Sequence, residues 1–273
     1  MPTIKEQLER QGTQWVVKRD SLLQQYTVDM LRNSWGSGNQ FFPGPQPVSI
    51  ERKHFRHLKK NRYVVCEKSD GVRHVMMAFM FHDSRMCVLV NRVFQVTLTP
   101  LSLPKNAYEG TILDGELVND KVFLVYDAVE VSGISVRSKN LIERLLAAEP
   151  VITGTLKLAT NPIVLRMKTF FGVKDLEKLQ NEHVPALDYK TDGLVFTPID
   201  EPIKTGTHET LFKWKPRDQN TVDFLIKRSR DKWSLHVSER GTLVFESELP
   251  DDKVPEWVTD GCIAECQYMV RAK

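Results

Sequence analysis

The chain has 273 residues, of which 41% are hydrophobic, so it can fold around a core and is not expected to be disordered. The length suits one large domain, or a large and a small one. Lys and Arg exceed Asp and Glu by only three, 38 against 35, which permits a polyanionic partner without requiring one.

Membrane and secretory functions are disfavoured. The first residues, MPTIKEQLERQG, lack the apolar core of a secretory signal, and no uncharged apolar run is long enough to span a bilayer. Only two of the four cysteines are close together, unlike the paired ligands of a typical metal site: Cys66, Cys87, Cys262 and Cys266. We therefore expect a soluble intracellular protein with reduced thiols and no membrane partner.

The first predicted element is a helix over residues 20–33. Apolar side chains between Leu22 and Leu31 recur at the spacing of an amphipathic helix, and Asp20 is the predicted N-cap. The next stretch, NSWGSGNQFFPGPQPVSI, is rich in Gly, Pro, Asn and Ser and predicts a loop.

Short β-rich runs follow from Tyr63 to Val131. Six of them, separated by short polar breaks, indicate a largely antiparallel sheet rather than βαβ units. Helical patterns at 138–148 and 173–181 flank a strand near 163–171, and strands resume at DGLVFTP and LFKWKP. The sequence thus predicts an α+β domain over 1–218, and four more β-like runs predict a smaller β module over 219–273.

The segment EKSDGVR places Lys68 between a β-rich run and the turn dipeptide Asp70-Gly71. A lysine held out at a strand end by a tight turn can reach a ligand, although the same pattern is common in surface hairpins. Similar acidic-glycine turns and lysines recur at the ends of later apolar runs, in Asp114-Gly115-Glu116, Asp192-Gly193 and Lys213-Trp214-Lys215. We expect these segments to converge on one cleft.

Such a cleft suits nucleotidyl transfer. Attack on an α-phosphate needs an unprotonated amine, cations for the developing charge, and carboxylates that hold a divalent metal. Arg73, Lys213 and Lys215 close to Lys68, together with a metal, would favour its neutral amine. If LFKWKP is a strand, Lys213 and Lys215 share one face and Trp214 points to the other. Tyr126, which ends the run VFLVY, is a candidate for stacking on a purine.

In order, these segments resemble the signature motifs of the covalent nucleotidyltransferase superfamily, which contains mRNA capping enzymes and ATP-dependent DNA and RNA ligases. FPGPQPVSI precedes the nucleophile motif EKSDGVR, and TILDGELV, FLVYDAVEVSG, TDGLVFTP and LFKWKPRDQNTVDF follow it. The tryptophan between two lysines and the trailing NTVDF are similar to guanylyltransferases. The resemblance covers residues from about 41 to about 226 in detail.

The resemblance implies a role for each matching residue of the nucleophile motif. Lys68 looks like the lysine that forms a phosphoramidate with GMP, and Asp70 and Gly71 share its nucleotide-binding motif. Arg73 matches a residue that contacts the ribose or the metal site. Tyr126 corresponds to the aromatic residue that stacks on guanine.

Further roles follow for the remaining motifs. Glu116 and Asp192 match residues of the metal site, which takes Mg²⁺ or Mn²⁺, and Glu116 is also placed near the ribose. Arg92, in VNRVFQV, resembles an arginine associated with phosphate or RNA contact. Three lysines are placed on the nucleotide, the first two at the α-phosphate and the third near the base edge: Lys213, Lys215 and Lys190.

The implied fold is a nucleotidyltransferase domain joined to an OB-fold, whose closure over GTP would be part of the cycle. Family members carry a last motif, R-x-D-K, that orients the pyrophosphate, whereas this sequence ends at ECQYMVRAK. We therefore expect a partial OB-fold over 219–273. GTP could still bind around Lys68, but pyrophosphate would lack its positioning group.

The predicted function is mRNA guanylyltransferase, which transfers GMP from GTP through Lys68 to a 5′-diphosphate RNA end. Two alternatives stay open: an ATP-dependent polynucleotide ligase, against which KWKPRDQNTVDF argues, and a GTP-binding recruitment module without turnover. Expected partners are GTP, RNA, an RNA triphosphatase, a cap methyltransferase and the C-terminal domain of RNA polymerase II. The expected location is the nucleus, or the cytoplasm for a viral protein.

Overall fold

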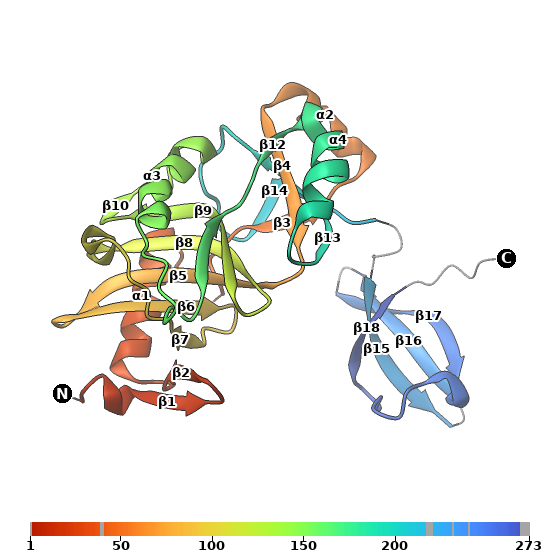
Figure 1. Ribbon diagram of the computed structural model, residues 1–273. Helices are drawn as coiled ribbons and strands as arrows, with labels where there is room; N and C mark the ends of the chain where they lie inside the picture. The colour runs from red at the N-terminus through yellow and green to blue at the C-terminus, as the bar shows by residue number, and fades with distance from the viewer. Residues whose placement is uncertain (1, 39–40, 217–220, 231, 240, 268–273) are drawn as a thin grey trace. The chain divides into compact units, whose positions relative to one another are not determined.

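The computed structural model describes residues 2–38, 41–216, 221–230, 232–239 and 241–267. The chain divides into two compact units, Met1–Trp214 and Lys215–Lys273, and each is described by itself. The predicted boundary between residues 218 and 219 falls within 217–220, outside the described residues. Within the described ranges the strands form three sheets, two in the first unit and one in the second (Figure 1).

The large sheet of the first unit contains most of the predicted β-rich runs. Its strands follow one another in the order β1 (Leu8–Gln11), β2 (Gln14–Val17), β7 (Val96–Leu98), β6 (Ser84–Asn91), β5 (Val72–Phe81), β8 (Thr111–Val118), β9 (Val122–Val131) and β10 (Ile134–Ser135). These neighbours are all antiparallel, as predicted. β11 (Val164–Met167) pairs with β9 in parallel.

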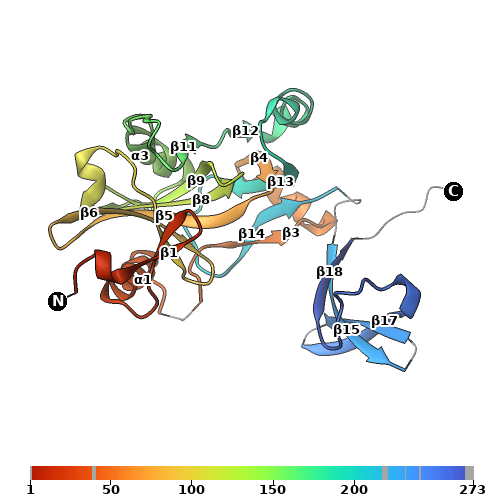
Figure 2. The same cartoon turned by 60° about the horizontal axis from the view of Figure 1, so that its bottom comes forward.

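Each face of the large sheet is covered by a helix. Successive side chains of a strand point to opposite faces, so Met76 of β5 packs in the cluster that contains Ala148 of α3 (Leu141–Thr153). Met77 packs instead with Leu23 and Leu31 of α1 (Leu22–Trp35). Figure 2 shows α3 and α1 on opposite sides of the sheet.

Local signals set the ends of α1. The Oγ of Ser21 accepts a hydrogen bond from the Gln24 backbone N–H, so Ser21 is the N-cap of α1, and the prediction of Asp20 was wrong. Asp20 has a positive φ of 60° and lies in the preceding turn. The helix runs past residue 33 to Gly36, whose left-handed backbone ends it.

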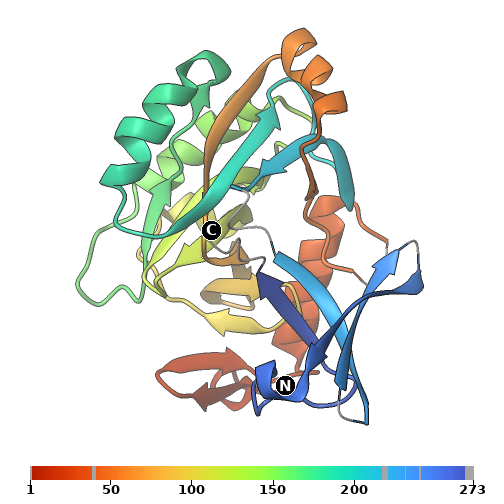
Figure 3. The same cartoon turned by 90° about the vertical axis from the view of Figure 1, so that its right-hand side faces the viewer.

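A second sheet carries the nucleophile motif. Its strands are ordered β12 (Phe171–Gly172), β4 (Tyr63–Ser69), β13 (Thr191–Pro198), β14 (Thr207–Trp214) and β3 (Gln46–Ser49). Figure 3 shows β4 in orange beside blue-green strands of this sheet. β3 lies inside the predicted loop and pairs with β14 in parallel, so that loop is partly a strand.

Short helical segments pack on the second sheet. η2 (Arg52–His54) leads into α2 (Phe55–Lys60), and the predicted helix 173–181 is broken into η4 (Val173–Asp175), α4 (Leu176–Lys178) and the π turn η5 (Leu179–His183), followed by η6 (Val184–Ala186). Leu58 and Leu176 pack against the core of Tyr63, Leu179 and Phe212. Elsewhere, η1 (Lys5–Gln7) precedes β1, and η3 (Lys105–Glu109) precedes β8.

The second unit is an antiparallel sheet, in agreement with the predicted β-rich module. Its order is β17 (Thr242–Pro250), β16 (Lys232–Glu239), β15 (Thr221–Ser229) and β18 (Ile263–Gln267), with η8 (Asp251–Lys253) after β17. Ile226, Trp233 and Leu235 form its core with Val258 and Ala264. The OB-fold assignment stays a prediction, and the terminal residues MVRAK lie outside the described residues.

The described helices are each too short or too polar to cross a membrane. The four cysteines are free, as the predicted reduced thiols require.

Candidate active site

Lys68 lies near the end of β4, one residue before the strand ends. Its Nζ donates hydrogen bonds to both carboxylate oxygens of Asp192, at 2.8 and 3.0 Å. The pairing register of β4 with β13 shifts between Thr191 and Leu194, and Gly193 inside this bulge has a φ of 147°. Because a bulge re-aims the side chains beside it, this irregularity accounts for Asp192 reaching Lys68.

A cavity of about 160 Å³ opens beside Lys68, between the two sheets of the first unit. Five of the predicted site residues line it, from β4, β5, β8, β9 and the turn after β6: Lys68, Arg73, Glu116, Tyr126 and Arg92. The other lining residues are Pro45, Pro47, Cys66, Ser69, Asp127, Lys168, Phe170, Val195, Thr197 and Leu211. The structure therefore brings these five predicted residues to one cavity.

Arg73 is held by a buried ion pair that the sequence did not reveal. Its Nε lies 3.0 Å from Asp114 Oδ1 and its Nη2 2.5 Å from Asp114 Oδ2, in a bidentate arrangement. The two side chains are only 7% and 2% exposed. Burial by itself would lower the pKa of Arg73, but the charge of Asp114 outweighs it and raises that pKa above its usual range. Arg73 is thus a fixed cation in the wall of the cleft.

The segment FPGP, which precedes the nucleophile motif, also fixes Arg73. Nη1 of Arg73 donates to the Pro45 carbonyl oxygen at 2.6 Å, and the guanidinium lies 5.5 Å from the centre of the Phe42 ring. A Cβ at Gly44 would lie 2.1 Å from Nη2 of Arg73, so only glycine allows this close approach. The motif therefore packs around the arginine rather than forming a free loop.

Tyr126 is positioned by the same ion pair. Its hydroxyl donates to Asp114 Oδ1 at 2.9 Å, and the Arg73 guanidinium lies 5.9 Å from its ring centre. Burial raises the pKa of Tyr126 well above its ordinary value, so the phenol stays neutral and keeps its proton for this bond. An aromatic ring fixed in the cleft wall is able to stack on a planar base.

Two carboxylates lie near Lys68, those of Asp192 and Glu116. Glu116 lies directly opposite Arg73 in the β5–β8 register and lines the cavity. Burial raises the pKa of Glu116, and Lys168, Lys68 and Arg73 oppose that shift. Among the described residues, no group of three or more His, Cys, Asp or Glu side chains is arranged to hold a metal ion.

Lys168 was missed by sequence reasoning. It lines the cavity, is almost completely buried, and donates a hydrogen bond to Ser69 Oγ at 2.6 Å. Its Nζ also lies 3.4 Å from Oε1 of Glu67, which accepts a hydrogen bond from the Tyr189 hydroxyl at 2.7 Å. Lys168 therefore contacts both neighbours of Lys68 on β4, Glu67 and Ser69.

Other predicted residues lie around the cavity without lining it. Asp70 donates its backbone N–H to the Lys190 carbonyl oxygen at 2.9 Å, so those two residues join the Asp70–Gly71 turn to the start of β13. A Cβ at Gly71 would lie 2.5 Å from the Leu117 carbonyl oxygen. The turn therefore packs closely on β8.

The lysines of LFKWKP are placed by the β13–β14 register. Lys213 lies opposite Val195, which lines the cavity, whereas Trp214 lies opposite Leu194 on the other face of the sheet. Lys213 is therefore on the cleft-facing side, and Trp214 points away from it, as predicted. Lys215 follows β14 directly.

The cavity contains another nucleophilic atom, the thiol of Cys66. Burial raises the pKa of Cys66 to about 12, so the thiol stays protonated and unreactive at neutral pH. Cys66 is therefore not a candidate nucleophile of the cleft.

Comparison with known proteins gives one family. Residues 6–217 match the family model described as the mRNA capping enzyme, catalytic domain. The chain is 33% identical over 251 residues to the mRNA-capping enzyme subunit alpha of Schizosaccharomyces pombe, covering 81% of this chain and 61% of that protein. It is 37% identical to the corresponding subunit of Yarrowia lipolytica, covering 68% of this chain and 54% of the relative.

An animal relative shows the same similarity. The mRNA-capping enzyme of Danio rerio is 34% identical over 206 residues, which are 68% of this chain and 34% of that protein. This chain therefore spans only part of the length of each of these relatives. Among solved structures, the ATP-dependent DNA ligase of bacteriophage T7 aligns with a TM-score of 0.44 and 14% identity, over 74% of this chain and 80% of that one.

Proposed function

The chain belongs to the mRNA capping enzyme family, and on that premise we propose that it is a guanylyltransferase, which moves GMP from GTP to the 5′ end of RNA. The observation that carries the proposal is the position of Lys68 at a strand end, beside a cavity that Arg73, Glu116 and Tyr126 also line. Of the two alternatives, the ligase is disfavoured by the family match. The labelling experiment below distinguishes a guanylyltransferase from a GTP-binding recruitment module without turnover.

The proposed reaction has two steps. The neutral amine of Lys68 attacks the α-phosphorus of GTP, and a nitrogen–phosphorus bond forms while the amine gives up one proton to solvent. The bond from the α-phosphorus to the bridging oxygen breaks, and pyrophosphate leaves. A terminal oxygen of a 5′-diphosphate RNA then attacks the same phosphorus. The nitrogen–phosphorus bond breaks, Lys68 regains a proton, and the GpppN cap is released.

We propose two roles for Asp192 that exclude each other: holding Lys68 at rest and binding a metal ion during the reaction. Its two oxygens accept hydrogen bonds from the Lys68 amine, which therefore points at a carboxylate. The same amine has to point at the α-phosphorus during the attack, so this pair has to open before Lys68 reacts. We propose that Asp192 holds Lys68 in place at rest and that nucleotide binding separates the two.

Glu116 and Asp192 fit a divalent cation by their chemistry. Carboxylate oxygens are the preferred ligands of Mg²⁺, which nucleotide enzymes hold through one or two carboxylates together with substrate phosphates. When bound, the cation neutralises charge on the phosphates. Lys213 and Lys215 are proposed to contact the α-phosphate, Arg73 the ribose and Arg92 the phosphate or the RNA, while Lys190 is proposed near the base edge.

The wider setting is proposed from the relatives. Two of them are named subunit alpha, so we propose that this protein works with separate capping components, an RNA triphosphatase and a cap methyltransferase. The C-terminal domain of RNA polymerase II is a further proposed partner. The nucleus is the proposed location of a cellular capping enzyme. The C-terminal unit is proposed to have an OB-fold.

The test is covalent labelling of the protein. The chain is incubated with magnesium or manganese and with GTP or ATP labelled at the α-phosphate, then denatured, and the label on the protein is measured. We expect label from GTP alone and its complete loss in Lys68→Ala. Lys157→Ala, a change at an exposed lysine outside the cavity, is the matched control and should label normally.

Each other outcome has a defined meaning. Label from ATP instead of GTP would make the protein a ligase. Measurable GTP binding without label would make it a recruitment module. Transfer of label to RNA that ends in a diphosphate, but not in a monophosphate, would establish the second step.

A further inference from the structure

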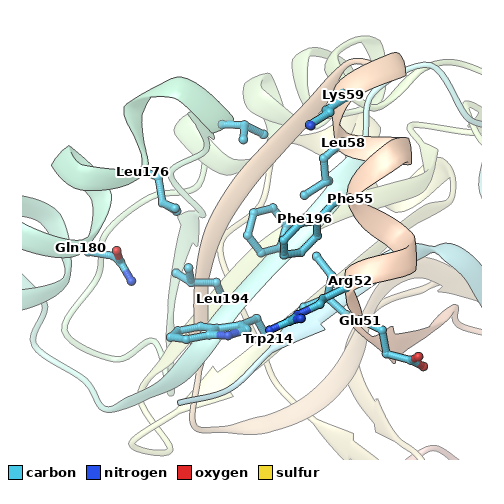
Figure 4. A pocket seen from close by; sticks show the side chains of 12 residues that line it. Glu51, Arg52, Phe55, Leu58, Lys59, Leu176, Gln180, Leu194, Phe196 and Trp214 are labelled. Carbon is cyan, nitrogen blue, oxygen red and sulfur yellow. The ribbon is translucent and has the colours of Figure 1, made fainter. Parts of the chain in front are cut away.

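An apolar groove lies on the opposite face of the second sheet from the candidate active site. Alternate residues of β13 face the two hollows, since Val195 and Thr197 line the cavity beside Lys68 while Leu194 and Phe196 line the groove. The groove has a volume of about 810 Å³. Figure 4 shows its walls, α2 on one side and the α4 segment on the other.

The lining of the groove is mostly hydrophobic. The apolar members come from both walls and from the sheet between them: Ile50, Phe55, Leu58, Val173, Leu176, Leu194, Phe196 and Trp214. Phe55 is 51% exposed and Trp214 38% exposed. Large exposed apolar side chains gathered in one concave surface are typical of a binding site for another molecule.

One wall of this groove is strongly basic. Between residues 52 and 60 the sequence RKHFRHLKK contains five Lys or Arg residues and no Asp or Glu. Two of the five, Arg52 and Lys59, line the groove itself, and Figure 4 places them toward opposite ends of the α2 wall. Glu51 also lines the groove, but its carboxylate pairs with Lys53 at 3.0 Å. A ligand in the groove therefore meets hydrophobic side chains flanked by cations.

We propose that this groove binds an amphipathic helix of a partner protein, with apolar side chains along one face and Asp or Glu beside them. The apolar side chains would pack on Phe55 and the groove floor, and the carboxylates would face Arg52 and Lys59. An amphipathic helix laid in an apolar groove between two walls is a recurring mode of peptide recognition. Charge complementarity at the rim then favours acidic partners and rejects basic ones.

The lining favours a peptide over RNA. Single-stranded RNA is bound by aromatic rings that stack on bases within a groove that tracks the phosphates with positive charge. Here five of the eight apolar lining residues are aliphatic, and a sixth, Phe196, is buried in the sheet. The cations gather on one wall. Aliphatic surface offers a base neither a stacking face nor a hydrogen bond, whereas it packs well against Leu, Ile or Phe.

The experiment is selection of peptides on the whole chain. A phage library of random dodecapeptides is selected against the immobilised protein, and the enriched peptides are synthesised with a fluorescent label for anisotropy titrations. We expect enrichment of peptides that combine spaced apolar residues with Asp or Glu. Single-stranded RNA oligonucleotides are titrated in parallel.

Variants assign the binding to the groove. Phe55→Glu should weaken the enriched peptides by about tenfold or more, since it puts a charge at the apolar anchor. The double change Arg52→Glu, Lys59→Glu should weaken them similarly and remove their salt dependence. The matched control is Leu146→Glu, at a residue that is 61% exposed on α3 and should bind peptides normally. GMP labelling should be unchanged in all of these variants.

Several results would overturn the proposal. One is an enriched set without an acidic bias, and another is equal binding to Phe55→Glu and Leu146→Glu. RNA binding that Phe55→Glu abolishes, with no groove-dependent peptide, would instead make the groove an RNA site. Because labelling at Lys68 is scored separately, failure here and failure of the proposed catalytic function are distinguishable.

Discussion

Removing either partner of the buried pair Arg73–Asp114 should severely destabilise the first unit. Arg73→Met leaves an aspartate carboxylate in a site that is 2% exposed, and Asp114→Leu leaves a guanidinium in one that is 7% exposed. An uncompensated buried charge costs about 3–5 kcal/mol. In a unit of this size that loss should lower the Tm by about 6–20 °C.

The double variant Arg73→Met, Asp114→Leu tests the reasoning more sharply. It removes both charges and refills the space with apolar atoms, so it should be less destabilised than either single variant. It still loses the acceptor of the Tyr126 hydroxyl and the donor to the Pro45 carbonyl, so it should not reach the wild-type value. The coupling free energy of this cycle should therefore be large and favourable.

The chain also offers a matched exposed pair. Arg166 makes a bidentate contact with Asp188 at 3.0 and 3.3 Å, but these side chains are 45% and 62% exposed. The cycle Arg166→Met, Asp188→Leu should show near-additive, small effects because solvent screens exposed charges.

The assay is urea titration followed by tryptophan fluorescence, with buried Trp35 reporting on the large sheet. If the double variant at Arg73 and Asp114 lost as much stability as the sum of the single variants, the argument from buried charge would be refuted. Equal coupling in the buried and exposed cycles would refute it as well.

Three further changes probe single atoms of the cleft. Gly71→Ala places a Cβ 2.5 Å from the Leu117 carbonyl oxygen, so melting curves and GMP labelling should both show losses. Glu116→Gln removes a desolvated carboxylate, so it should raise the Tm at neutral pH while lowering GMP labelling. Burial raises the pKa of Glu116 above 4.5, so as the pH falls Glu116 becomes protonated in the folded wild type before it does in the unfolded chain. Protonation removes the buried charge, so melting curves should show the gain in Tm of Glu116→Gln shrinking toward pH 4.5. Tyr126→Phe loses the hydrogen bond to Asp114 and should cost about 1 kcal/mol in urea titrations, with the ring retained.

Much of the fold follows from patterns in the sequence. The β-rich runs from Tyr63 to Val131 all became strands because their apolar residues match the alternation of a sheet. The runs did not reveal that β4 belongs to the second sheet, where it pairs with β13. Strand partners are set by long-range packing, which one sequence does not encode locally. The early hairpin of β1 and β2 was also missed, although its two-residue turn at Gly12 and Thr13 is a local signal.

The candidate site was predictable where a residue lies in a motif with its own turn. Lys68 and Glu116 are such residues, and both lie at the cleft. Asp114 was visible only as part of an acidic-glycine turn, because its contact with Arg73 is diagonal across the β5–β8 register rather than directly opposite. Lys168 had no local signal, since its place depends on the parallel pairing of β11 with β9 and on its backbone bond to Val125.

The connection between β4 and β5 has a mechanical consequence. Lys68 lies at the end of one sheet and Arg73 near the start of the other, and only the short link through Asp70 and Gly71 separates the two strands. Two residues can span only a short distance, so the link keeps the end of β4 close to the start of β5. The strand end that carries Lys68 and the strand start that carries Arg73 are therefore coupled in position, because neither can shift far without pulling the other through Asp70 and Gly71.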